Sequence, residues 1–110
     1  MDDQIGIKIL FILDLSQVRN YSKEFQRFGC ILNQELCVLI RNNTPVTPGN
    51  PDRREKIKIT GILSDKKVLP EFECKCMDVL RNIPCITNIS IASCSVFDVF
   101  LFLISGKYYG

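Results

Sequence analysis

One stretch decides the fold, and it reads KIKITGILSDKKVLPEFECKCMDVLRNIP over residues 56–84. It opens with KIKIT (56–60), where lysines alternate with isoleucines, as expected of a strand with one polar and one apolar face. A polar break, SDKK (64–67), follows. Beyond it, apolar residues recur at helical spacing. The stretch therefore predicts a strand that leads through a short polar turn into an amphipathic helix.

The helix expected after this break has one apolar stripe and a proline near each end. Pro70 belongs near the helix start, where its missing N–H costs least, and Pro84 ends the helix. Polar residues such as Glu71 and Lys75 fall on the opposite side. The stripe consists of Leu69, Phe72, Cys76, Val79, Leu80 and Ile83.

Three further elements are expected before this stretch. The isoleucine-rich residues 5–15 predict a buried strand, and residues 18–28 predict a first helix that Gly29 ends. Residues 37–41 predict a second strand, antiparallel to the strand at 56–62. Between these two strands, residues 42–55 contain three prolines and no apolar pattern, so they predict a long loop.

Two strands are expected to close the chain as a hairpin around residues 93–94. They cover residues 86–92 and 95–104. Both faces of the last one are apolar, which predicts a strand that is central in the sheet or covered on both sides. The fold expected is α+β, an α/β sandwich with two helices packed on one face of a mostly antiparallel sheet, in the order β-α-β-β-α-β-β.

The composition is that of one ordinary globular domain, expected to span residues 1–110. The chain is 46% hydrophobic and 24% charged. It starts Met-Asp-Asp-Gln, which is acidic where a secretory signal would be basic, so the six cysteines are expected to be reduced thiols. No apolar run approaches the roughly 20 residues of a membrane span. We therefore expect a cytoplasmic protein without a membrane partner.

Positive charge is concentrated in the middle of the chain. Residues 41–67 hold seven basic and three acidic residues, so this segment carries about +4, whereas residues 1–40 and 68–110 each carry −1. Such a concentration is typical of a surface that binds phosphates. A solvated basic loop is the alternative interpretation of the same charges.

Catalytic chemistry is poorly represented in this sequence, and we expect neither an enzyme nor a cofactor nor a small-molecule substrate. There is no histidine, and no glycine-rich phosphate loop occurs. Cys74, Cys76, Cys85 and Cys94 have the spacing C-x-C-x8-C-x8-C, which differs from the paired C-x2-C of structural zinc sites. No metal site is therefore expected, although a metal-binding or redox role of the cysteines stays open as an alternative.

The basic residues are the remaining functional signal, and we expect them to bind RNA phosphates. Lys56 and Lys58 share one strand face. Lys66 and Lys67 open the helix, where backbone N–H groups and the helix dipole favour an anion. The full set of candidates for RNA binding is Lys56, Lys58, Lys66, Lys67, Lys75 and Arg81, aided by Arg41, Arg53 and Arg54.

The order of these elements resembles the eukaryote-specific family of large-subunit ribosomal protein twenty-two. The opening strand ends in Leu13-Asp14, and a short helix with Phe25 or Phe28 and a polar loop follow. The strand KIKIT matches a family strand of the Lys-Ile-x-Val/Ile-Thr kind, and Asp65-Lys66-Lys67 stands where the family has Ser-Lys-Arg. The spacing from Lys56 to Phe102 follows the family without a large gap, with Ser93 in the turn and Phe97 and Phe102 at aromatic positions.

This resemblance implies a structural constituent of the large (60S) ribosomal subunit, with large-subunit rRNA and neighbouring ribosomal proteins as partners. The family's lysine-dense helix start carries over onto Lys66 and Lys67, and less closely onto Lys75 and Arg81. The chain departs from the family in two respects. Its helix also carries Glu71, Glu73 and Asp78, and no acidic tail follows. Fewer cations predict weaker RNA binding and a shallower salt dependence.

The main alternative is a small intracellular protein–protein interaction module without RNA binding. In that case the apolar last segment, or the proline-rich loop, would contact the partner. Association that is indifferent to salt would favour this alternative, because phosphate contacts weaken as salt rises.

Overall fold

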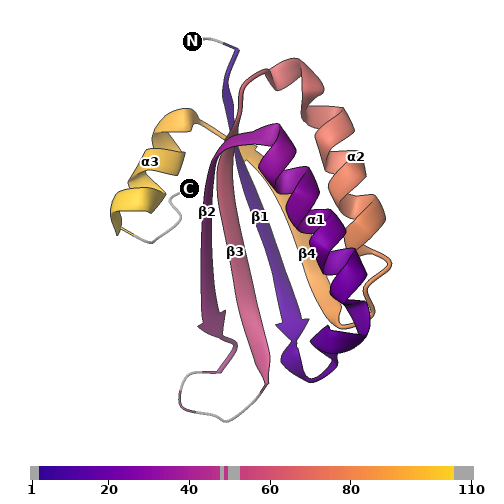
Figure 1. Ribbon diagram of the computed structural model, residues 1–110. Coiled ribbons are helices and arrows are strands. Elements are labelled where there is room, and N and C mark those ends of the chain that lie inside the picture. The colour runs from indigo at the N-terminus through magenta and orange to yellow at the C-terminus, as the bar shows by residue number, and fades with distance from the viewer. Residues whose placement is uncertain (1–2, 48, 50–52, 106–110) are drawn as a thin grey trace.

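The computed structural model describes residues 3–47, 49 and 53–105 (Figure 1). The termini and part of the connection before Arg53 lie outside the described residues. The α-helices and strands are β1 (Ile5–Asp14), α1 (Ser22–Glu35), β2 (Leu36–Pro45), β3 (Arg54–Leu63), α2 (Leu69–Leu80), β4 (Ile86–Cys94) and α3 (Val96–Ser105). Two short 3-10 helices, η1 (Leu15–Tyr21) and η2 (Lys66–Val68), precede α1 and α2.

The four strands form one antiparallel sheet in the order β2-β3-β1-β4. Ile9 at the centre of β1 lies opposite Ile59 of β3 and Ile91 of β4. A β-α-β-β-α-β chain with this strand order has the ferredoxin-like arrangement. The expected α+β architecture, with two helices on one face of the sheet, is therefore confirmed, and so is the antiparallel pairing of β2 with β3.

The main core lies between this sheet and the pair α1 and α2, which run side by side in Figure 1. Alternate residues of β1 point into it, so Ile7 and Ile9 are completely buried. Phe11 meets Phe28 of α1 edge to face, with 6.2 Å between ring centroids. The predicted stripe of α2 is confirmed at its buried positions, Phe72, Cys76, Val79 and Leu80.

The alternation of the KIKIT segment in β3 is also confirmed. Ile57 and Ile59 are buried against the helices, whereas Lys56 on the opposite face is exposed and Lys58 is half-buried. The next residues on the lysine face, Thr60 and Ile62, are buried as well. A second element therefore covers that end of the opposite face.

The second covering element is α3, and it corrects our prediction of a final strand over residues 95–104. Residues 96–105 form a helix that packs on β1 and β3, apart from α1 and α2 (Figure 1). Val99 and Phe102 are its buried residues. A uniformly apolar segment fits strand and helix periods equally well, so periodicity could not decide between them. The closing hairpin and the seventh element of the predicted order were therefore wrong.

Gly6 lets α3 approach the sheet closely. A Cβ atom at this position would lie 2.7 Å from the Sγ of Cys94, the carbonyl oxygen of Ser95 and the Cγ2 of Val99. These distances are shorter than van der Waals contact, so any side chain here would displace the start of α3 or the end of β4.

Two predicted boundaries in the first half of the chain were also wrong. Gly29 does not end the first helix, because α1 continues to Glu35. The loop predicted at 42–55 is shorter, since β2 extends to Pro45 and β3 begins at Arg54. Pro45 is tolerated because β2 is an edge strand, where a missing N–H breaks no central ladder.

Candidate interaction surface

The face of the sheet opposite α1 and α2 is covered only at one end. At the other end, Leu10 and Ile12 of β1 are half-buried and Lys56 of β3 is exposed. Here β1 and β4 change register between Leu10 and Ile12, and Asn88 of β4 takes a positive φ of 55°. We call this region, defined by Leu10, Ile12, Lys56, Lys58 and Asn88, the open half; these residues line a hollow of about 210 Å³.

The exposed side of α3 is apolar. Phe97 is 69% exposed, Phe100 46%, Leu103 57% and Ile104 83%, and we call these four residues the α3 ridge. A helix that is apolar all round is normally buried on every side, yet the described chain covers only Val99 and Phe102 fully. A contiguous exposed apolar surface of this kind marks an interaction site.

The two regions lie on the same face of the molecule, and charged side chains lie next to both. Asp98 is the only charged residue in α3, and the Ser95 hydroxyl accepts a hydrogen bond of 3.1 Å from its backbone N–H. On the open half the charged side chains are those of Lys56 and Lys58. At the α3 end, Asp98 and Lys8 both act on the Cys94 thiol, so that end of the face carries both signs of charge.

The structure brings only part of the predicted RNA-binding set together. By strand alternation, Arg54 shares the face of Lys56 and Lys58. Lys8 of β1 lies on the same face, since it pairs with Thr60, and sequence reasoning did not single it out. Arg53 precedes β3, and its carbonyl oxygen accepts a hydrogen bond from Leu15.

Lys66 and Lys67 lie at the opposite end of β3, in η2, and both are exposed. The backbone N–H of Lys67 donates to the Asp65 carboxylate at 2.9 Å, and that of Lys66 donates to the Asp3 carbonyl oxygen at 2.6 Å. These two amides therefore already have acceptors. The side-chain charges remain at this corner, but the expected contribution of the backbone N–H groups to anion binding is reduced.

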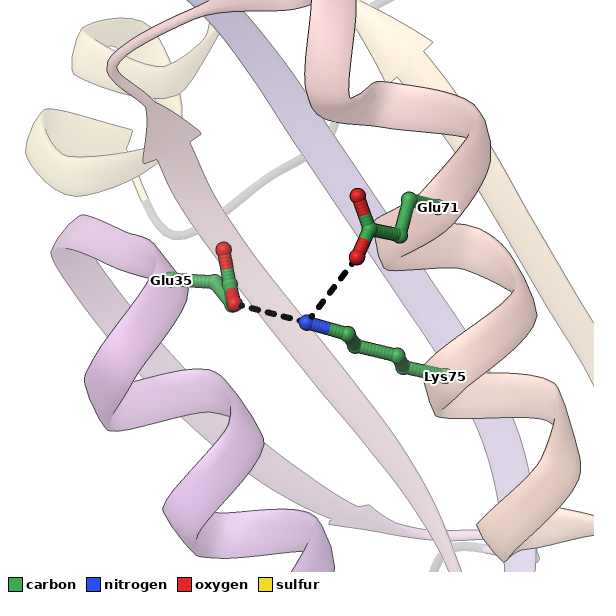
Figure 2. A network of polar contacts seen from close by, with 3 residues as sticks. All are labelled: Glu35, Glu71 and Lys75. Carbon is green, nitrogen blue, oxygen red and sulfur yellow. Dashed lines mark hydrogen bonds and ion pairs between the residues drawn. The ribbon is translucent and has the colours of Figure 1, made fainter.

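Lys75 lies between the two helices of the covered face (Figure 2). Its Nζ is 3.1 Å from the Oε1 of Glu35 in α1 and 3.5 Å from the Oε1 of Glu71 in α2. The hydrogen bond and charge of Glu35, followed by the charge of Glu71, raise the pKa of the Lys75 ammonium. Two carboxylates thus offset this cation, so it is a weak candidate for a phosphate contact.

The other two arginines are separated from the open half. Arg41 pairs with Ile59 across β2 and β3 and therefore belongs to the helix-covered face. Arg81 follows α2 as its C-terminal cap. The nine candidates consequently do not form one continuous basic surface.

The six cysteines are all free thiols. Burial raises the pKa of the Cys76 thiol to about 12, with smaller contributions from Glu35 and Glu73, and Cys74 on the other side of α2 is exposed. Within residues 3–47, 49 and 53–105, no three His, Cys, Asp or Glu side chains are grouped so that they could hold a metal ion. In the same part of the chain, no helix is long and apolar enough to cross a membrane.

Comparisons with known proteins support the fold and nothing finer. No family model matches the chain, and no curated protein matches it. Among solved structures, a Caulobacter crescentus protein whose name proposes an antibiotic biosynthesis monooxygenase has a TM-score of 0.55 at 9% identity, covering 86% of this chain and 90% of its own. A hypothetical Arabidopsis thaliana protein has a TM-score of 0.56 at 7% identity, covering 84% and 88%.

A de novo designed protein, Foldit4, is similar to the same degree. Its TM-score is 0.54 at 8% identity, and the match covers 84% of this chain and 98% of that one. A designed protein shares this fold, so the fold does not imply one particular activity. Similarity at such low identity shows the fold alone.

Proposed function

We propose that this chain is a non-catalytic association module whose first partner is a second copy of itself. One observation carries this proposal: the α3 ridge and the open half lie on one face, each apolar and each without an intramolecular cover among the described residues. Burial of apolar surface is the main driving force of association. In a symmetric pair, the α3 ridge of each copy can be buried on the open half of the other copy.

The pairing follows from where α3 lies along the strands. It covers the end of the sheet at which β1 begins, whereas the open half lies toward the end at which β1 finishes. A two-fold axis in the plane of the interface, perpendicular to the strands, reverses the strand direction of the second copy. Each α3 would then lie on the open half of the other copy.

The side chains suit this arrangement. Phe97 or Phe100 can enter the partner's hollow of about 210 Å³ beside Leu10 and Ile12. Asp98 of the same helix would then lie on the side of the interface that carries Lys56.

The size of the face is enough for a specific dimer. Strands of about ten residues rise ~3.3 Å per residue and lie ~4.8 Å apart, so a four-stranded face measures roughly 600 Å². Two such faces bury about 1,200 Å² in total, the lower end of the range for specific interfaces. Sedimentation from low to high micromolar concentration therefore measures the affinity itself, which area alone does not set.

Sedimentation equilibrium of the purified protein, from low to high micromolar concentration, tests the proposal. The wild type should pass from monomer to dimer, and Phe97→Ser should remain monomeric at every concentration. Lys23→Ser, an exposed change on α1, is the matched control and should dimerise normally. A wild type that stays monomeric, or a Phe97→Ser protein that still dimerises, would refute the association module.

The rRNA-binding role expected from the sequence stands as a second proposal, with its large-subunit and cytoplasmic setting. It is supported by Lys56 and Lys58 on one strand face and by the exposed pair Lys66 and Lys67. The dimer proposed above would cover Lys56 and Lys58. Lys66 and Lys67 in η2 lie outside that interface, so they could bind RNA even in the dimer.

Sucrose-gradient sedimentation of a cell lysate in low and high salt distinguishes the two proposals. A ribosomal protein should comigrate with large subunits and be loosened by salt, and the double variant Lys66→Glu, Lys67→Glu should leave them. A module that only self-associates should stay at the top of the gradient in both salts. In that case the ribosomal assignment would be abandoned.

A further inference from the structure

A cavity of about 330 Å³ lies on the helix-covered face, between α1 and the sheet. It is separated by the sheet from the surface that we propose for association. Its walls are mainly aromatic and aliphatic, whereas its rim carries the polar side chains of Asn33 and Arg41. The apolar lining consists of Phe11, Leu13, Val18, Phe25, Phe28, Gly29, Leu32, Leu39, Ile57 and Ile59.

Gly29 keeps one wall of this cavity open. It lies in the middle of α1, where glycine is less favourable than alanine, so its presence has an energetic cost. Close packing does not require it, because a Cβ atom here would find nothing within 4 Å. A larger side chain at this position would instead project into the cavity.

Arg41 supplies a positive charge at the rim. Its Nε donates a hydrogen bond of 3.1 Å to the Oδ1 of Asn43, and this is the only partner of its guanidinium among the described residues. The other N–H groups of the guanidinium form a planar fork, and the geometry of this fork matches the two oxygens of a carboxylate. An apolar cavity with a single cation at its mouth has the chemistry of a site for an amphiphilic acid.

We propose that this cavity binds a medium-chain fatty acid, with the hydrocarbon chain inside and the carboxylate on Arg41. A volume of about 330 Å³ is at the small end of ligand sites and holds about eleven groups of the size of water. A saturated acid of about that many heavy atoms, such as decanoate, fits this space. The inference goes beyond the association module and does not depend on it, since the two sites use opposite faces.

Isothermal titration calorimetry with decanoate, kept below its micelle concentration, tests the proposal, and decanol serves as the neutral counterpart. The wild type should bind both ligands. Arg41→Gln should bind decanoate about tenfold more weakly or worse, since a charged hydrogen bond is lost, while its affinity for decanol should be unchanged. Arg41 is exposed, so this variant is expected to fold.

Gly29→Leu fills the cavity and should abolish binding of both ligands. Circular dichroism would confirm its fold, and the Arg41→Gln comparison stands even if this variant fails to fold. Phe97→Ser is the control for adsorption on the α3 ridge and should bind decanoate as the wild type does. The proposal is overturned if the wild type binds no decanoate, if Arg41→Gln affects both ligands equally, or if only Phe97→Ser loses binding.

Discussion

The two faces of the sheet are made by the same strands but are completed in different ways. On the helix-covered face, the residues of β1 from Ile7 to Leu13 that point inward are at most 5% exposed. On the opposite face, α3 covers Gly6, whereas Lys8, Leu10 and Ile12 are all half-buried. The first face is therefore closed over β1 by the chain itself, and its opening is the cavity beside β2.

This difference indicates where stability and association reside. The closed face holds the large core side chains, including Phe72 and Leu80, so it should supply most of the folding free energy. The second face retains apolar side chains that the described chain does not cover, so it should contribute little to folding and much to association. Variants that separate these two contributions test the comparison.

Ile9→Ala and Ile12→Ala are a matched pair, since both truncate an isoleucine of β1. Ile9 is completely buried, so its truncation should lower the free energy of unfolding by about 2–5 kcal/mol. Ile12 is half-buried on the open half, so its truncation should cost far less in the monomer and weaken the dimer instead. Urea denaturation at low protein concentration measures the first effect, and equal losses would contradict the comparison.

The free energy of unfolding should also depend on pH in the alkaline range, because the Cys76 thiol is buried on the closed face. Burial raises the pKa of its thiol from 9.0 to about 12, so the unfolded chain loses this proton first as pH rises. The contribution is therefore complete below pH 9 and is lost progressively as pH rises from 9 to about 12.

Denaturation curves of the wild type and Cys76→Ala across this interval provide the measurement. The difference in unfolding free energy between the two proteins should shrink as pH rises, because only the wild type carries the buried thiol. A constant difference would mean that Cys76 is accessible to water in the folded state.

Gly6→Ala tests how α3 is held on the second face. The added methyl group would meet Cys94, Ser95 and Val99 at 2.7 Å, so we expect a loss of about 1–3 kcal/mol. Hydrogen exchange should rise in α3 while α1 and α2 stay protected. Uniformly faster exchange would show instead that α3 is part of the same cooperative unit as the main core.

Gly29→Ala should change stability in the opposite direction from Gly6→Ala. The position is helical and a Cβ atom there has free space, so the change should stabilise the protein by about 0.5–1 kcal/mol. Thermal denaturation beside Gly6→Ala gives the contrast directly. A destabilised Gly29→Ala protein would contradict the open space that we assign to the cavity.

The smallest effect is expected at Lys75. Its ion pairs with Glu35 and Glu71 join α1 and α2 (Figure 2), but the side chain is exposed and solvent screens the interaction. Lys75→Met should therefore change the unfolding midpoint little, and salt should reduce even that change. Lys23→Met on the surface of α1 is the control, and a large difference between the two would mean that the ion pair is stronger than its exposure implies.

The β-α-β-β-α-β part of the fold could be predicted because its patterns are distinct. KIKIT alternates with period two, and the stripe from Leu69 to Ile83 has helical period. Residues 96–105 lack such contrast, since nearly every side chain is apolar. One signal there was available: Ser95 followed three residues later by Asp98 is typical of a helix start, and the structure contains that capping bond.

The candidate surface was harder to predict than the fold. Sequence reasoning placed Arg41 with Lys56, but register decides which face each strand residue occupies, and register depends on pairing partners far away in sequence. The pairing of Lys75 with Glu35 likewise joins residues forty positions apart. Leu10 and Ile12 were missed because apolar residues look alike whether they are buried or exposed. The apolar last segment was named as a contact surface only in the protein–protein alternative, and there as a strand rather than as the helix α3.

The central claim, that α3 covers the open half of a second copy, is tested most directly by isotope-filtered NMR. A sample that mixes labelled and unlabelled chains, at a concentration where the dimer predominates, reports only contacts between chains. The account predicts cross-peaks from the rings of Phe97 or Phe100 to the methyl groups of Leu10 and Ile12. A monomer throughout, or a dimer whose intermolecular cross-peaks come from other surfaces alone, would contradict it.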